Sequence, residues 1–147
     1  MMPLVQSGSK PHGVTAVQPA TVYAGLLLFH GDWEGAHNVA QGIDKADGSY
    51  WHAIVHRQEP DAGNAAYWFR QVGSHPIFAS LREDAAEILK RYPRVNFKLP
   101  AVWNPGAFID LCELAIAQPG SELEQTAMEI QHAEWTRLFE WCKRISK

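Results

Sequence analysis

The chain has 147 residues, of which 46% are hydrophobic and 20% are charged, and its formal net charge is −3. That length favours a single domain, and a globular chain of this size can bury a substantial core. The slight acidic balance argues against nucleic acid and against a strongly anionic membrane surface as partners, because both attract chains with a basic excess.

The first 20 residues are predicted to form an extended arm, because prolines and small polar residues interrupt any regular helix. This arm lacks the apolar core of a signal peptide, and the longest apolar stretch, residues 22–29, is too short to span a bilayer. We therefore expect a cytoplasmic chain with no membrane segment, whose residues 21–147 form one helical domain. The arm could pack on its own chain or on a partner subunit, which leaves a homo-oligomer open.

Helix start and stop signals follow one another along the rest of the chain. A glycine or a proline follows each expected helix except the last. Asp47 and Gly48 are expected to form a turn, and residues 93–103 a loop. The expected N-caps are Thr21, Asp32, Ser49, Asn64 and Ser121, the last in a capping box with Glu124. The expected helices cover residues 22–30, 33–41, 50–59, 65–72, 76–92, 105–118 and 122 onward.

The expected helices carry apolar stripes with helical spacing, and no stretch of the sequence alternates as a strand would. We therefore expect an all-α fold, a single compact bundle of about seven helices preceded by the extended arm.

Two imidazoles and a carboxylate share one stripe of the expected third helix. At about 100° per residue, His52 and His56 lie about 40° apart, and Glu59 falls within about 20° of His52. His37 on the preceding helix could supply a further ligand. Histidines at this spacing can bind one Zn²⁺ ion, so the pattern predicts a divalent metal site, zinc first, with Glu59 or Asp61 as the catalytic base.

A second interpretation of the same histidines needs no metal. The run HAIVH lacks the glutamate that makes HExxH a specific metal motif. Buried histidines also bond to carboxylates and backbone carbonyls and in that way hold helices together.

The segment from residue 51 to residue 76 also offers groups for a small anionic or polar ligand. Arginine binds carboxylate or phosphate in a fork, and aromatic rings can line a pocket. The alternative is that Arg57 and Arg70 pair with Glu59 and Asp61 in a structural network. The candidate ligand-binding residues are Trp51, Arg57, Asn64, Tyr67, Arg70 and His75.

The run WHAIVHR-x-EPD-x-GNA-x-YWFR-x-VG-x-HP, within residues 51–76, resembles a family of small helical bacterial-type proteins that is uncharacterised. The resemblance extends over residues 32–78, about a third of the chain. It implies no activity, ligand or catalytic residue, and it marks this segment as the signature of the chain.

Two classes of function follow from these patterns. The first is a metal-dependent hydrolase that uses the His52, His56 and Glu59 face of a helix. The second is a non-enzymatic binding or structural protein, whose His, Arg and Glu network holds a small anionic ligand or only the fold. The sequence leaves open whether the chain is an enzyme.

Overall fold

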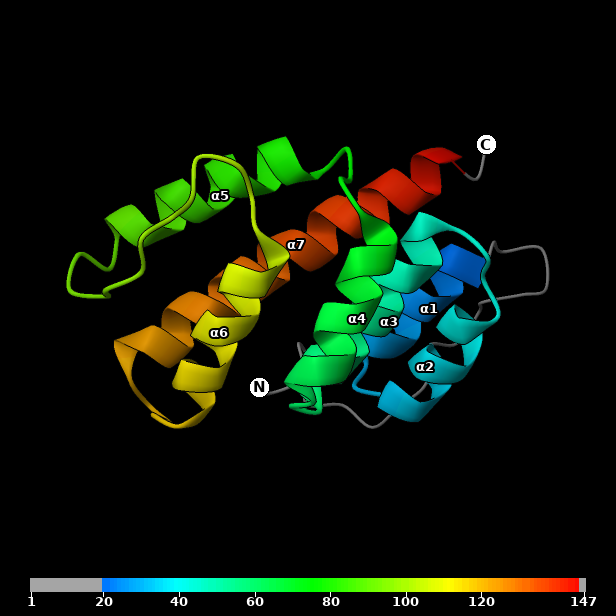
Figure 1. Cartoon of the computed structure of the whole chain (residues 1–147), viewed down its shortest axis with the longest axis horizontal. Helices are drawn as coiled ribbons and strands as arrows, with labels where there is room; N and C mark the ends of the chain where they lie inside the picture. The colour runs from blue at the N-terminus through cyan, green and yellow to red at the C-terminus, as the bar shows by residue number, and fades with distance from the viewer. Residues whose placement is uncertain (1–19, 146–147) are drawn as a thin grey trace.

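The computed structural model describes residues 20–145, which form seven helices and no strand (Figure 1). The all-α prediction is confirmed. Ala20, expected in the arm, is the first residue of α1, and the rest of the arm lies outside the described residues. The helices are α1 (Ala20–Phe29), α2 (Trp33–Gln41), α3 (Ala46–Gln58), α4 (Ala62–Val72), α5 (Phe78–Lys90), α6 (Pro105–Ile116) and α7 (Glu122–Ile145).

Helix α3 is the central element of the fold. It contacts α1, α2 and α4, and most of its side chains are buried. Figure 1 shows α1 to α4 gathered on one side and α5 and α6 on the other, with the long α7 extending along both groups. Helix α7 contacts α1, α5 and α6, and α4 contacts α6, so the two groups share one hydrophobic core. No helix in the described part of the chain is both long and apolar enough to cross a membrane.

The start of α3 differs from the sequence prediction. The turn expected at Asp47 and Gly48 is wrong, as is the cap expected at Ser49, because α3 begins at Ala46. Gly48 packs so closely against Ile43 that an added Cβ would lie 2.5 Å from the Ile43 Cβ. This close approach and the burial of the Asp47 side chain are tertiary contacts, which override the local preference of this pair of residues for a turn.

The start of α4 also differs. The expected cap, Asn64, lies inside the helix, and Asp61 is the N-cap, whose side chain accepts a hydrogen bond from the Asn64 backbone N–H at 3.3 Å.

The capping box of α7 is half confirmed, since Ser121 Oγ accepts from the Glu124 N–H at 3.1 Å. The Glu124 carboxylate accepts from Gly120 N rather than from Ser121 N.

Helices α1, α3 and α7 meet at Gly25. A Cβ at this position would lie 2.7 Å from Trp51 Cζ2, and the Gly25 carbonyl accepts a hydrogen bond from Trp135 Nε1 at 2.9 Å. Trp51 is completely buried here. Its indole therefore fills the core between helices, and it does not offer the ligand-binding face expected from the sequence.

Substituting Gly25→Ala should lower the free energy of unfolding by ~1–3 kcal/mol, because the rigid indole of Trp51 leaves no room for the methyl group. Gly63→Ala is the matched control, since a Cβ there meets nothing within 4 Å, and it should be neutral or stabilising by up to ~1 kcal/mol. Urea unfolding of both variants measures the difference. A Gly25→Ala variant as stable as the parent would contradict this packing.

Candidate metal centre

Three histidines converge where α2 packs against α3. His37 comes from α2 and His52 and His56 from α3, and one ligand atom of each lies within 4.8 Å of the other two. The ring centroids are 4.3 Å apart for His37 and His52, 5.3 Å for His37 and His56, and 4.9 Å for His52 and His56. The structure thus brings together the three residues that the sequence nominated as metal ligands. We call them the histidine cluster.

The register between α2 and α3 places His37 in the cluster. Residues 42–45 make a short connection, which favours antiparallel neighbours. Trp33 Nε1 at the start of α2 donates to Gln58 Oε1 at the end of α3, at 2.7 Å. In antiparallel helices with that pair opposed, His37 lies level with the middle of the turn between His52 and His56.

Burial keeps His52 neutral. The side chain is almost completely buried, and the Trp68 indole stacks on the imidazole with centroids 4.0 Å apart and planes 16° apart. Desolvation, followed by the proximity of His37 and His56, lowers the pKa of His52 from 6.5 to about 4. His52 Nδ1 is buried and has no hydrogen-bond partner among the described residues. An unpaired buried nitrogen is unfavourable, and this ring lacks the hydrogen bond that buried histidines usually make.

His56 lies at the more open side of the cluster. Its side chain is 12% exposed, and Nδ1 is 3.1 Å from Glu59 Oε1, close enough for ion pairing although the ring nitrogen is not aligned for a hydrogen bond. Carboxylates beside metal-binding histidines orient the ring and raise its basicity. Glu59 at Nδ1 leaves Nε2 of His56 available for a metal ion.

Arg57 lies in a buried network away from the surface. Its Nη2 donates to Glu134 Oε1 at 2.6 Å and to Gln131 Oε1 at 3.2 Å. Tyr50 OH donates to Glu134 Oε2 at 2.8 Å. Burial, and then the charge of Glu134, raise the pKa of Tyr50 well above its usual value, so the hydroxyl stays protonated. The expected pairing of Arg57 with Glu59 or Asp61 is wrong, because α7 supplies the partner.

His75 belongs to a second buried pair. Its Nε2 lies 2.7 Å from Asp47 Oδ1, and its Nδ1 accepts a hydrogen bond from the Ile77 N–H at 3.2 Å. The hydrogen of a neutral ring is therefore assigned to Nε2. The pair joins the first turn of α3 to the segment before α5, and it positions the helices rather than a ligand.

The remaining candidates lie at the surface of α4. Asp61 accepts from Asn64 Nδ2 at 2.6 Å, and hydrogen bonds from Asn64 lower the pKa of the Asp61 carboxyl. Tyr67 is 46% exposed, and the Arg70 guanidinium lies 5.9 Å from its ring centre. These contacts explain Asp61 and Asn64 as a helix cap and Tyr67 and Arg70 as a surface pair, whereas Arg57 and His75 are buried.

Two further residues shape this region. Trp68, within the segment of residues 51–76, stacks its indole on His52 and so forms a wall of the histidine cluster. Glu134 was not a candidate, although it interrupts the apolar series Ala127, Ile130 and Leu138 at helical spacing. A carboxylate in such a stripe indicates a buried cationic partner.

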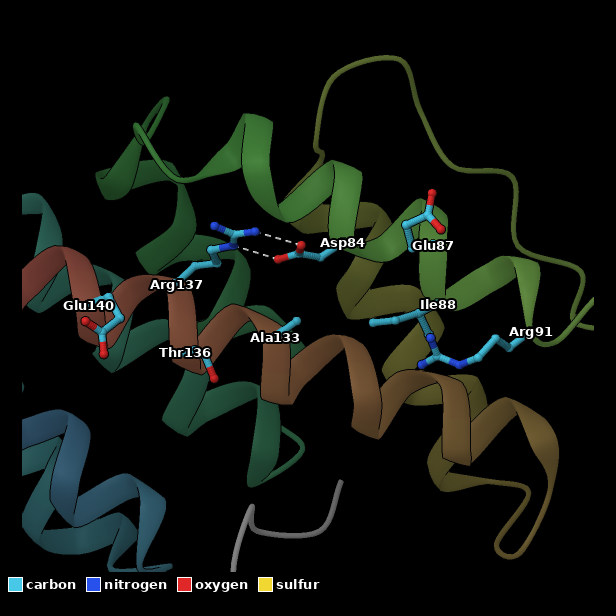
Figure 2. Close-up of a pocket in the computed structure, with 8 residues that line it drawn as sticks. All are labelled: Asp84, Glu87, Ile88, Arg91, Ala133, Thr136, Arg137 and Glu140. Atoms are coloured by element: carbon cyan, nitrogen blue, oxygen red, sulfur yellow. Dashed lines mark hydrogen bonds and ion pairs between the residues drawn. The ribbon is translucent and has the colours of Figure 1, made fainter.

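A groove of about 460 Å³ lies between α5 and α7. Figure 2 shows eight of the side chains that line it, among them Asp84 and Arg137. Arg137 reaches across it and donates two hydrogen bonds to Asp84, at 2.7 and 2.9 Å. The groove is therefore spanned by a paired guanidinium and carboxylate, and the histidine cluster is the stronger candidate for chemistry.

Substituting Glu134→Gln should lower the free energy of unfolding by ~3–5 kcal/mol, because the Arg57 charge would remain buried without a counter-ion. Asp84→Asn removes the partner of Arg137, which is partly exposed, and should cost less than ~1 kcal/mol. Chemical denaturation of the two variants makes the comparison. Similar losses in both would mean that Arg57 is not desolvated as described.

The metal-free protein should lose stability in acid through His52. The unfolded chain binds a proton at this residue below about pH 6.5, and the folded chain does so only near pH 4. The contribution of His52 to the free energy of unfolding is complete above pH 6.5 and is lost as the pH falls toward about 4. With a chelator present, the unfolding free energy of the parent and of His52→Gln is measured between pH 6.5 and about pH 4. As the pH falls, it should decrease less steeply for His52→Gln than for the parent, by up to ~1.4 kcal/mol per pH unit. His132→Gln, at an exposed position, should follow the parent, and equal slopes in all three proteins would refute the shift.

Comparison of the chain with known protein families, with curated proteins and with solved structures found no match. The resemblance of residues 51–76 to a family of helical proteins stays a prediction, and the function is inferred from the geometry of the histidine cluster.

Proposed function

We propose that this chain binds a divalent transition-metal ion through His37, His52 and His56, with zinc as the first candidate. The observation that carries the proposal is the convergence of three imidazole nitrogens within 4.8 Å of one another. Nitrogens that share a tetrahedral zinc ion at about 2.0–2.1 Å lie about 3.3 Å apart. The three nitrogens would therefore have to approach one another by at most about 1.5 Å to share one ion.

The donor set favours particular metals. Imidazole suits zinc, copper, iron and nickel, whereas magnesium and calcium prefer oxygen ligands. The low pKa of His52 keeps its lone pair free at neutral pH, as metal binding requires. Three protein ligands leave a fourth position open, which is the pattern of catalytic zinc sites rather than of closed structural ones.

Hydrolysis is the more specific form of this proposal. His37, His52 and His56 would hold the ion, which would supply acidification of a bound water molecule near neutral pH. Glu59 contacts His56, so we assign it to positioning that ring, while Asp61 caps α4. The metal ion itself would then be the main source of catalytic power.

The alternative is a structural role for the cluster. Arg57, Glu134 and Tyr50 form a buried polar network that only joins helices, and the stacked rings of Trp68, His52 and His56 could do the same. A measurement of metal binding distinguishes the proposed metal site from a purely structural role of the three histidines.

Metal analysis of tag-free protein dialysed against zinc tests the proposal. We expect near-stoichiometric zinc in the parent, and its loss in the double variant His52→Ala/His56→Ala. His132→Ala, at an exposed position on α7, should retain zinc. Glu59→Gln should retain the site with ~10–100-fold weaker affinity, because it removes a carboxylate from beside a ligand. A parent that takes up no zinc, copper, nickel or iron would overturn the proposal.

A further inference from the structure

The connection between α5 and α6 contains a strand-like segment, in which the chain makes neither a turn nor a bend between residues 95 and 100. Half-buried and exposed side chains alternate along it, in the order Val95, Asn96, Phe97, Lys98 and Leu99. Phe97 and Leu99 pack against the hydrophobic core. Burial of every second residue is typical of an extended chain with one face on a core. The loop expected over residues 93–103 therefore includes five residues that do alternate as a strand would, although no strand pairs with them.

The backbone of this segment is available for pairing. In the part of the chain that the structure describes, residues 96–100 make no hydrogen bond from backbone to backbone. Arg82 Nε, on α5, donates to Pro100 O at 2.8 Å, which identifies the edge that faces α5. Because the backbone groups of alternate residues in an extended chain point to the same edge, those of Phe97 and Leu99 point away from α5. Such a row of unpaired N–H and C=O groups is a template for another extended chain.

A groove of about 450 Å³ adjoins the start of the segment, at Arg94, Val95 and Asn96. No residue of α5 lines it. The residues across from the segment belong to α6, to α7 and to the turn between them, and they are Leu114, Gln118, Ser121, Glu122 and Leu123. The Leu114 side chain is 56% exposed. The groove thus offers an apolar contact to a chain that lies along the segment.

The charge of Lys98 indicates which partner fits. Lys98 is exposed and makes no ion pair among the described residues, whereas Arg94 pairs with Glu122. A carboxylate opposite Lys98 on a neighbouring strand would be stabilising. A second copy of the segment, paired symmetrically about Phe97, would instead place Asn96 opposite Lys98 and bring two lysines onto one face. An acidic partner is therefore favoured over a second copy of this chain.

We infer that residues 95–99 bind an extended acidic segment of a partner protein as an added antiparallel strand. The backbone of the partner would pair with Phe97 and Leu99, a carboxylate would face Lys98, and an apolar side chain would contact Leu114. None of these residues belongs to the histidine cluster, so this inference is independent of the proposed metal site.

The peptides acetyl-Val-Glu-Val-Glu-Val-amide and acetyl-Val-Lys-Val-Lys-Val-amide are the probes, since they share the alternation and differ in charge. Each is titrated into the ¹⁵N-labelled full chain. We expect the glutamate peptide to shift the backbone amide signals of Phe97 and Leu99 and to slow their hydrogen exchange. It should bind about three- to tenfold more tightly than the lysine peptide. Methylation of the three valine nitrogens should weaken its binding by about tenfold or more, because the strand hydrogen bonds are lost.

Variants at exposed positions test the two side-chain contacts. Lys98→Glu should reverse the preference for the glutamate peptide, whereas Lys45→Glu, at an exposed position beside α3, should retain it. Leu114→Ser should weaken binding by about two- to fivefold, because less apolar surface is covered. Tyr67→Ser, at an exposed position on α4, should bind as the parent does.

Three results would overturn the inference. The first is a glutamate peptide that leaves the Phe97 and Leu99 signals unchanged, or that binds equally well when its valine nitrogens are methylated. The second is a preference for the glutamate peptide that survives Lys98→Glu. The third is a shift of the same amide signals with protein concentration alone, which would make a second copy of the chain the occupant.

Discussion

The burial of α3 between three other helices governs where the central polar groups of this protein can lie. A polar side chain removed from water is unfavourable unless it finds a partner. On α3, Asp47 pairs with His75, Arg57 with Glu134, and Gln58 with Trp33. Each of these contacts joins α3 to a different part of the chain, so the polar groups of this helix also determine how its neighbours are placed.

The histidine cluster stands apart from those pairs. Arg57 pairs with Glu134 and Asp47 with His75, whereas three imidazole rings face one another in the cluster. The protein disfavours protonation of His52 and leaves its Nδ1 without a partner in the described structure. The proposed binding of a soft or borderline metal ion would require such a site, one that resists protons and offers nitrogen lone pairs.

Local geometry explains what the sequence could predict. The spacing of His52 and His56 follows from helical periodicity, and a short connection made His37 a neighbour of both. Tertiary packing explains the misses. Gly48 was expected in a turn, but its contact with Ile43 favours helix, and the partner of Arg57 lies 77 residues away on α7. No local pattern identifies such a partner, although a glutamate within an apolar stripe signals that one exists.

The positions of the three clustered histidines along the chain have a consequence for folding. All three lie between residues 37 and 56, within a single helical hairpin, whereas the contact between Arg57 and Glu134 closes a loop of 77 residues. Closing a short loop loses less chain entropy, and contacts that are local in sequence form fastest. The cluster can therefore assemble while α7 is still undocked, and an ion captured at that stage would act as a nucleus around which the remaining helices condense.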